Sequence, residues 1–226
     1  GTALLAKQQG YDVFVSDGGA IKENYREELE ENEIEFEENR HTPEKILNAG
    51  EIMKSPGIPE KNELVKQIRA KGIDVISEIE FAYRYKGNSK IIAITGSNGK
   101  TTTTALTYHI CKTGGAEISS FQLDDIKTFR PDVAVITNIT EDHLDRYEYK
   151  FENYIQSKFR VVMNQQHEDV FIYNLDDAVT VKTINNYPIK STLAPITMSK
   201  QLPQGAYLLN AKMHLKWKSE EMQMSI

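Results

Sequence analysis

Residues 95–102, with the sequence Thr-Gly-Ser-Asn-Gly-Lys-Thr-Thr, constrain the fold of this chain more than any other stretch. They follow an apolar run at 91–94 that is typical of a buried parallel strand, and they precede a segment at 105–110 that indicates a helix. This order predicts a phosphate-binding loop, because small residues let backbone N–H groups close on phosphate oxygens at the positive end of the helix. We therefore expect an α/β fold that binds a nucleotide phosphate at this loop.

The loop is a shortened form of the general pattern, which has a glycine five residues before the Gly-Lys pair, where this chain has Ile94. Lys100 is expected to place its charge at the β- and γ-phosphates, and the Thr101 hydroxyl to bind Mg²⁺. An ordinary Gly-Asn turn before a helix is the alternative interpretation. The expected nucleotide-binding residues are Thr95, Gly96, Ser97, Asn98, Gly99, Lys100, Thr101 and Thr102.

Composition places the chain among globular proteins, since 39% of its 226 residues are hydrophobic and 27% are charged. No apolar run approaches the ~20 residues that span a bilayer, and we expect neither membrane insertion nor a signal peptide. The net charge of −6 falls within the first 87 residues, so neither half has the basic excess of a nonspecific nucleic-acid binder. The single cysteine, Cys111, fits a reducing cytosol, and its place on the predicted helix favours a buried thiol.

Short helices and strands alternate through the first half, which predicts a parallel sheet with helices on its faces. We expect helices at 2–9, 21–33, 43–49 and 62–71, and strands at 11–17, 34–36, 51–54 and 74–77. Thr42 is a candidate N-cap for the third helix, with Pro43 at its first position. Asp17 ends a strand where such folds place an acidic residue on a ribose or another hydroxyl, and Gly1 is a candidate last glycine of a nucleotide-binding turn.

A boundary is expected at 86–89, between a domain at 1–87 and a domain at 88–226. The second domain has predicted strands at 91–94, 132–138 and 170–174, a helix at 151–163 and an antiparallel hairpin within 205–226. The junction after the loop's helix is too short for the predicted fold. The helix is expected to end at Gly114-Gly115, yet Ala116 already lies near the end of a predicted strand. A strand needs about five residues. We therefore expect a missing segment near 115/116.

Three further side chains in the second half suit the chemistry of a phosphate loop. Glu117 lies at the end of one predicted strand and His143 follows another, so both are expected at the carboxyl edge of the sheet, where open α/β sheets bind ligands. Lys158 lies on a predicted helix. Mg²⁺ prefers oxygen ligands and shares phosphate oxygens, whereas an imidazole ligand indicates a second divalent site that Mn²⁺ also fits. Each has a simpler interpretation. Glu117 could be an ordinary carboxylate at a strand end, His143 a polar residue at a helix start, and Lys158 a solvent-facing lysine.

At these residues the sequence resembles the bacterial Mur ligases of peptidoglycan synthesis, over essentially the whole chain. The motifs that carry the resemblance lie at 16–17, 54–59, 77–80, 95–102, 116–123 and 138–147. Those at 116–123 and 138–147 look specific to the branch that adds D-glutamate. The resemblance implies a Rossmann-like parallel-sheet domain that binds a UDP-sugar at 1–87, without its first part. It also implies a P-loop α/β ATPase-like central domain at 88–226, with the C-terminal domain absent.

The resemblance implies an ATP-dependent ligase that phosphorylates the carboxylate of UDP-N-acetylmuramoyl-L-alanine and joins it to D-glutamate. Lys100, His143 and Lys158 would be catalytic, and Lys158 matches the family lysine that is carbamylated. The implied ligands of Mg²⁺ or Mn²⁺ are Thr101, Glu117, His143 and Lys158. The implied substrate-binding residues are Asp17, Ser55, Pro56, Gly57, Ser120 and Gln122. Of these, 55–57 could instead be a turn, and Ser120 and Gln122 could equally be local caps.

The resemblance further implies a cytoplasmic monomer, and a piece limited to these residues is expected to be inactive alone. A sibling ligase, including a folylpolyglutamate-type enzyme, is the nearest alternative. A P-loop kinase or ATPase would explain Lys100 and Thr101 but leave His143 and the first half unused. A nucleotide-binding module without catalysis is the third hypothesis. The remaining histidines show no constellation and are expected to be structural: His41, His109, His167 and His214.

Overall fold

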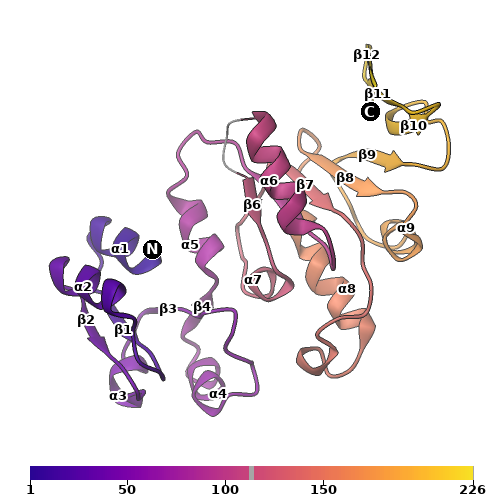
Figure 1. Ribbon diagram of the computed structural model, residues 1–226. Coiled ribbons are helices and arrows are strands. Elements are labelled where there is room, and N and C mark those ends of the chain that lie inside the picture. The colour runs from indigo at the N-terminus through magenta and orange to yellow at the C-terminus, as the bar shows by residue number, and fades with distance from the viewer. Residues whose placement is uncertain (112–114, 226) are drawn as a thin grey trace. The chain divides into compact units, whose positions relative to one another are not determined.

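The computed structural model describes residues 1–111 and 115–225, which form two compact units, Gly1–Gly87 and Asn88–Ile226 (Figure 1). Both units alternate helices with strands, as the sequence predicts for an α/β protein. No helix among the described residues is long and apolar enough to cross a membrane.

The first unit contains five helices and four short strands among its described residues. The helices are α1 (Thr2–Gln8), α2 (Glu23–Glu31), α3 (Pro43–Ile46), α4 (Glu63–Ala70) and α5 (Glu78–Arg84). The strands are β1 (Phe14–Ser16), β2 (Glu35–Glu37), β3 (Glu51–Met53) and β4 (Asp74–Ile76). Strand β1 pairs with β2 and β3 with β4, both in parallel, and no ladder joins the two pairs within the described chain. A core around Ala6, Ile76 and Phe81 packs helices α1 and α5 together.

Local capping explains where two of these helices begin. The Asn62 side chain accepts hydrogen bonds from the first turn of α4, and the Ser77 hydroxyl accepts one from the first turn of α5. Thr42 occupies the N-cap of α3 as expected, but its side chain does not cap the helix. Its hydroxyl donates to Glu37 at 2.5 Å instead, because an ionised carboxylate is the stronger hydrogen-bond partner.

The second unit is built on an eight-stranded sheet with the order β12-β11-β10-β9-β8-β7-β5-β6. Its strands are β5 (Ile92–Thr95), β6 (Gly115–Glu117), β7 (Val133–Ile136), β8 (Val170–Asn174), β9 (Thr192–Thr197), β10 (Gly205–Leu209), β11 (Lys212–Trp217) and β12 (Glu220–Ser225). All neighbours from β6 to β10 are parallel, and β10, β11 and β12 are antiparallel. The expected hairpin turns at Asn210 and Ala211, which both have positive φ, as a tight hairpin requires.

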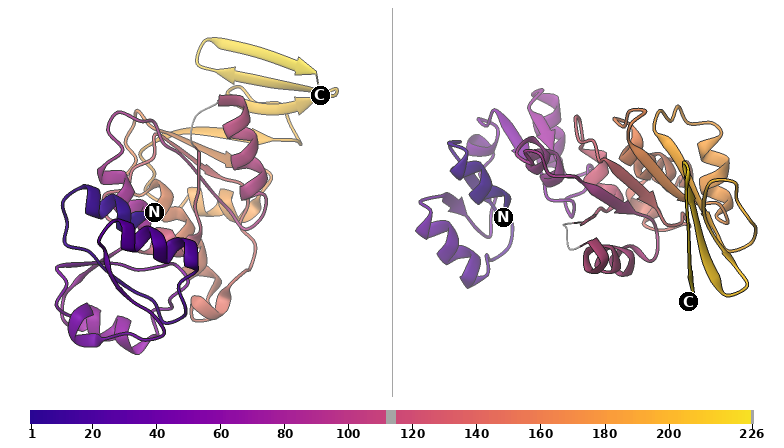
Figure 2. Two further views of the ribbon diagram at one scale, coloured as in Figure 1. Left: turned by 60° about the vertical axis from the view of Figure 1, so that its left-hand side comes forward. Right: turned by 90° about the horizontal axis from the view of Figure 1, so that it is seen from above.

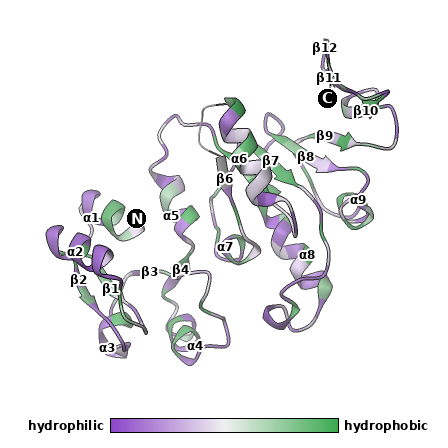
Figure 3. Ribbon diagram, in the orientation of Figure 1, coloured by the Kyte–Doolittle hydropathy of each residue, from purple (hydrophilic) through white to green (hydrophobic). Residues whose placement is uncertain are grey.

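Helices flank this sheet, and α6 and α8 lie on opposite sides of it (Figure 2). The helical elements are α6 (Lys100–Cys111), α7 (Ser120–Asp124), α8 (Phe151–Phe159) and α9 (Ala178–Ile184), with 3₁₀ turns η1 (Leu144–Arg146) and η2 (Arg160–Val162). The central strand β7 is hydrophobic whereas α2 of the first unit is strongly hydrophilic, as Figure 3 shows. Strand β7 is therefore buried in the sheet's core, where Ala134 and Ile136 are fully inaccessible.

Helix α6, which follows the glycine loop, has Cys111 as its last residue. Cys111 is exposed rather than buried, because no described side chain of α6 is buried in the structure. The helix was expected to end at Gly114-Gly115. Residue 114 lies outside the described residues, whereas Gly115 belongs to strand β6 and pairs with Ile92 instead of ending a helix. The missing segment near 115/116 stays a prediction.

Candidate functional site

The candidate site of the second unit lies where three neighbouring parallel strands end. The glycine loop follows β5, Glu117 is the last residue of β6, and the segment 137–143 follows β7. Parallel neighbours place their carboxyl ends at one edge of a sheet, and ligands of open α/β sheets bind there. The register pairs Ile94 with Glu117 and Thr95 with Ile136, so the three ends are level.

Glycine is required at position 96 for two independent reasons. Its φ is +150°, a conformation that residues with a side chain rarely adopt. A Cβ atom there would lie 1.9 Å from Oγ1 of Thr137 and 3.2 Å from the carbonyl oxygen of Asn138. The loop after β5 is therefore packed directly against the segment after β7.

Hydrogen bonds from this second segment fix the shape of the loop. The Asn138 side chain accepts from the backbone N–H of Asn98 at 3.0 Å and donates to its carbonyl at 3.1 Å. The Ser97 hydroxyl donates to the Thr140 carbonyl and accepts from the Thr140 N–H, each at 2.9 Å. The Tyr154 hydroxyl lies 3.2 Å from the same Ser97 oxygen. No motif in the sequence marks Tyr154, although it lies one helical turn before Lys158.

Two lysines converge on the carbonyl oxygen of Gly96. Lys100 Nζ donates to it at 3.0 Å and to the Ser97 carbonyl at 3.0 Å, while Lys158 Nζ donates to it at 2.7 Å. Lys158 is 2% exposed and lies 4.6 Å from the centre of the Tyr154 ring. Burial, followed by the positive charge of Lys100, lowers the pKa of Lys158 to about 7. A buried amine that is partly neutral at neutral pH is thus placed against the phosphate loop.

Thr101 and Glu117 are also brought together. The Thr101 hydroxyl donates to Glu117 Oε1 at 3.0 Å, beside the start of α6. Hydroxyl and carboxylate oxygens fit Mg²⁺, which takes few protein ligands and completes its shell with phosphate and water. Among the described residues, no three His, Cys, Asp or Glu side chains form a metal cluster. The donor set therefore fits a cation shared with phosphate rather than an all-protein cage.

His143 lies in the segment after β7, where it precedes the 3₁₀ turn η1 with a positive φ of 51°. Its ring packs 5.2 Å from the Phe121 ring, and its Nε2 lies 3.4 Å from an Asp142 carboxylate oxygen. Phe121 also contacts the Arg146 guanidinium and the Tyr147 ring. The structure therefore holds His143 against α7 through aromatic contacts and leaves its imidazole exposed.

Helix α7 carries Ser120 and Gln122, and the structure engages both locally. Gln122 and Ser119 form a reciprocal capping box, in which Gln122 Oε1 accepts from the Ser119 N–H at 3.0 Å. The Ser120 carbonyl accepts from the Ser157 hydroxyl of α8, and Ser120 itself is buried. These contacts support the local-cap alternative for Gln122. Burial raises the pKa of nearby Asp124, against hydrogen bonds from Ser157 and Tyr147.

In the first unit, the residues implied for substrate binding lie after β1 and β3. Asp17 follows β1, and its carboxylate accepts from the Gly19 N–H at 2.8 Å. The stretch 55–57 follows β3 and forms a turn, closed by a hydrogen bond from the Ile58 N–H to the Ser55 carbonyl at 3.0 Å. Beneath this turn, buried Lys54 donates to the Ile58 carbonyl and pairs with Glu60.

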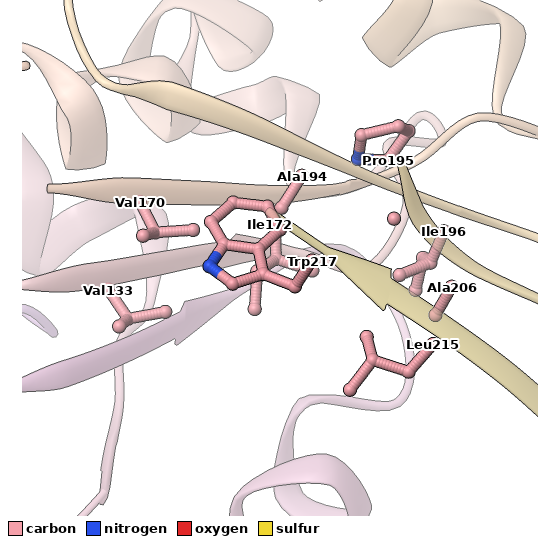
Figure 4. Close-up of a pocket in the computed structure, with 10 residues that line it drawn as sticks. Val133, Val170, Ile172, Ala194, Pro195, Ile196, Ala206, Leu215 and Trp217 are labelled. Atoms are coloured by element: carbon pink, nitrogen blue, oxygen red, sulfur yellow. The ribbon is translucent and has the colours of Figure 1, made fainter. Parts of the chain in front are cut away.

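An apolar hollow of about 240 Å³ lies elsewhere on the second unit (Figure 4). Trp217 is surrounded there by aliphatic side chains of β7, β8, β9 and β11. Its lining includes Val133, Ile172, Ala194 and Leu215. A nucleotide or an acidic substrate needs charged and hydrogen-bonding groups that this lining does not offer. The hollow is therefore not the candidate site.

Two family models match the chain. The Mur ligase middle domain matches residues 116–225, and the MurD N-terminal domain matches residues 2–64. A UDP-N-acetylmuramoylalanine–D-glutamate ligase of Christiangramia forsetii is 47% identical over an alignment of 236 residues. The alignment covers 93% of this chain and 53% of the relative. The enzyme of the same name from Cytophaga hutchinsonii is 48% identical over 92% of the chain and 52% of its own length. The chain thus spans about half the length of these relatives.

The Christiangramia alignment is longer than this chain, at 236 against 226 residues, so the relative carries residues within the matched span that this chain lacks. Solved structures agree on the fold. A UDP-N-acetylmuramate:L-alanyl-gamma-D-glutamyl-meso-diaminopimelate ligase from Neisseria meningitides superposes with a TM-score of 0.63 at 15% identity, over 91% of this chain and 78% of that one. UDP-N-acetylmuramate-alanine ligase MurC from Thermotoga maritima superposes with a TM-score of 0.53 at 17% identity, over 99% of this chain and 57% of that one.

Proposed function

Because the chain belongs to the Mur ligase family, we propose that it provides two domains of an ATP-dependent ligase that joins D-glutamate to UDP-N-acetylmuramoyl-L-alanine in peptidoglycan precursor synthesis. The carrying observation is the group of side chains around the glycine loop. Lys100 and Lys158 share the Gly96 carbonyl, and Thr101 bonds to Glu117 beside them. This arrangement supports phosphoryl transfer to a carboxylate.

In the proposed reaction, a carboxylate oxygen of UDP-N-acetylmuramoyl-L-alanine attacks the γ-phosphorus of ATP, which forms an acyl phosphate and releases ADP. The amine of D-glutamate then attacks the acyl carbon, and loss of phosphate and a proton leaves the amide. Phosphoryl transfer needs positioning and charge neutralisation more than covalent help. Lys100 would leave the loop carbonyls to pair with phosphate oxygens, and the N–H groups of the loop would orient them.

Thr101, Glu117, His143 and Lys158 would hold the divalent cations, Mg²⁺ or Mn²⁺, which neutralise phosphate charge when bound. The lysine would serve as a carbamate. With its pKa at about 7, the Lys158 amine is partly neutral, so its lone pair can attack the carbon of CO₂. Loss of a proton then gives an anionic oxygen donor. This chemistry supports a lysine close to cations.

The first unit would bind the UDP portion of the substrate through Asp17 and the turn at 55–57. Both follow the carboxyl ends of parallel strands, where nucleotides bind in such folds. The proposed function includes neither nucleic-acid binding nor membrane insertion. We propose a monomer that acts in the cytoplasm.

The test is ADP release by the full-length gene product with Mg²⁺, ATP and UDP-N-acetylmuramoyl-L-alanine. D-glutamate is compared with L-glutamate, L-lysine and no amino acid. Release that depends on D-glutamate is expected. Release supported by another amino acid would keep the family and overturn this substrate. Release that needs neither the UDP-sugar nor an amino acid would favour a P-loop ATPase.

A further inference from the structure

His41 is one of four histidines without a constellation in the sequence, and the structure places it, exposed, in a hydrogen-bond network beside Asp17. Its Nδ1 lies 2.7 Å from the Ser16 hydroxyl, and its Nε2 lies 2.9 Å from the position that a Cβ of Gly18 would take. The imidazole therefore packs onto the turn that follows β1. A side chain at position 18 would displace it.

Glu37 at the end of β2 holds this network in place. Its carboxylate accepts from the Thr42 N–H at 2.7 Å, from the Thr42 hydroxyl at 2.5 Å and from the Ser16 hydroxyl at 2.8 Å, and Arg40 pairs with it at 3.4 Å. Burial alone would raise the pKa of Glu37, but these hydrogen bonds and Arg40 lower it to about 2. Glu37 is thus ionised near neutral pH and can only accept hydrogen bonds.

The ionised carboxylate fixes the tautomer of His41. Because the ionised Glu37 carboxylate can only accept, the Ser16 hydroxyl donates its single hydrogen to Glu37. The Ser16 oxygen must then accept from His41, so Nδ1 carries the hydrogen of the neutral ring. Nε2 is left as an acceptor, and it has no hydrogen-bond partner within the part of the chain that the structure describes.

The Asp17 carboxylate is a second acceptor at the same turn. One of its oxygens accepts from the Gly19 N–H, while the backbone of 39–40 donates to the carbonyls of Gly19 and Asp17 and joins the two loops. Two acceptors beside the Gly18-Gly19 turn suit a ligand that offers neighbouring hydroxyl donors. A vicinal diol such as the 2′- and 3′-hydroxyls of a ribose has this chemistry, whereas phosphate offers only acceptors near neutral pH.

We propose that His41 is a specificity-determining residue of the nucleotide site, and that its Nε2 accepts a hydrogen bond from a ribose hydroxyl of the UDP group. The inference rests on the proposed function of the first unit and adds a contact to it. Glu37 and Ser16 are the positioning residues, since they act only through the orientation and tautomer of His41.

The experiment measures binding of UDP, 2′-deoxy-UDP and 3′-deoxy-UDP to the full-length protein by calorimetry. The wild type should prefer UDP over one deoxy analogue by roughly 3- to 10-fold, the effect of one hydrogen bond between uncharged groups. His41→Asn keeps an N–H donor toward Ser16 but lacks an acceptor at the place of Nε2, so this preference should fall to about one. His41→Gln, which reaches that place with an amide oxygen, should restore part of the preference.

A purely structural role for His41 would weaken UDP and both deoxy analogues equally in His41→Asn, and an unchanged preference would overturn the inference. A wild type that binds UDP without discriminating either analogue would overturn it as well. Failure of the wild type to bind UDP would overturn the proposed function together with the inference. His167→Ala is the matched control, because His167 is an exposed histidine of the second unit and its loss should change no ratio.

Discussion

At the scale of single residues, the phosphate loop depends on one glycine that no other residue can replace. Ala at position 96 would meet the Thr137 hydroxyl at 1.9 Å and would have to hold φ near +150°. We expect Gly96→Ala to lower the free energy of unfolding by roughly 1–3 kcal/mol, the cost of one strongly strained residue, and to weaken ATP binding. Thermal unfolding and ATP titration measure both effects.

Gly50→Ala is the control for this change, because a Cβ at position 50 meets nothing within 4 Å. It should leave ATP binding unchanged. Equal ATP affinity in Gly96→Ala and the wild type would show that the close approach of the loop to Thr137 is unimportant.

Glu37 predicts how acid acts on the first unit. Its folded-state pKa of about 2 lies below the ordinary value of 4.5, so its contribution to stability is present above pH 4.5 and is lost as the pH falls from 4.5 toward 2. We expect Glu37→Gln to destabilise the protein at pH 7 by about 1–3 kcal/mol, the cost of disrupting buried hydrogen bonds. Denaturant titrations of both proteins between pH 7 and pH 3 should show the difference shrinking.

Glu27→Gln serves as the comparison, since Glu27 is an exposed carboxylate of α2. It should leave stability nearly unchanged across the whole range. A difference between Glu37→Gln and the wild type that stayed constant down to pH 3 would contradict the ionised network around Ser16 and His41.

At the scale of elements, the start of α7 depends on the capping box between Ser119 and Gln122. We expect Ser119→Ala to cost about 1 kcal/mol of stability, because the first N–H groups of the helix lose their acceptor. The same change should reduce kcat of the proposed ligation reaction in the full-length protein, since α7 carries Phe121, which packs against His143. Ser219→Ala, in the turn after β11, is the control. A loss of stability no larger than that of the control would contradict the box.

Most elements of both units could be predicted from the sequence, because glycines at helix ends, capping residues at helix starts and apolar runs in strands mark them. Strand β8 was predicted at its observed bounds, and β5 was placed one residue early. Strand β12 was missed because Glu220–Ser225 is polar and exposed along its whole length, so no hydrophobic alternation marks it. The helix at 151–163 ends at Phe159 and tightens into a 3₁₀ turn, a change that local propensity does not encode.

The candidate site was predictable where local motifs carry it and not where tertiary contacts do. The glycine loop, with Lys100 and Thr101, follows from residues adjacent in the sequence. The convergence of Lys158 on Gly96 joins residues 62 positions apart, and only the fold reveals it. The proposed role of His41 likewise depends on the buried carboxylate of Glu37 in β2 and the hydroxyl of Ser16 in β1, neither of which has a motif of its own.

At the scale of the whole molecule, the division into two compact units predicts that UDP and ADP protect different parts of the chain. A ligand at 100 times its Kd stabilises the state that binds it by about 2.7 kcal/mol. We expect UDP to slow amide hydrogen exchange within Gly1–Gly87, and ADP with Mg²⁺ to slow it around the glycine loop of the second unit. Protection of the glycine loop by UDP alone would contradict this assignment.

The apolar hollow around Trp217 gives the last prediction, because parallel sheets are normally covered on both faces and this face presents aliphatic side chains. A polypeptide of residues 1–226 should bind the dye ANS there, as exposed apolar surface does. Trp217 is the single tryptophan of the chain, so bound dye should quench its emission by energy transfer. Trp217→Phe should abolish the transfer but keep the binding, whereas dye that binds without quenching Trp217 would place the exposed apolar surface elsewhere, for example on Leu106, Tyr108 and Ile110 of α6.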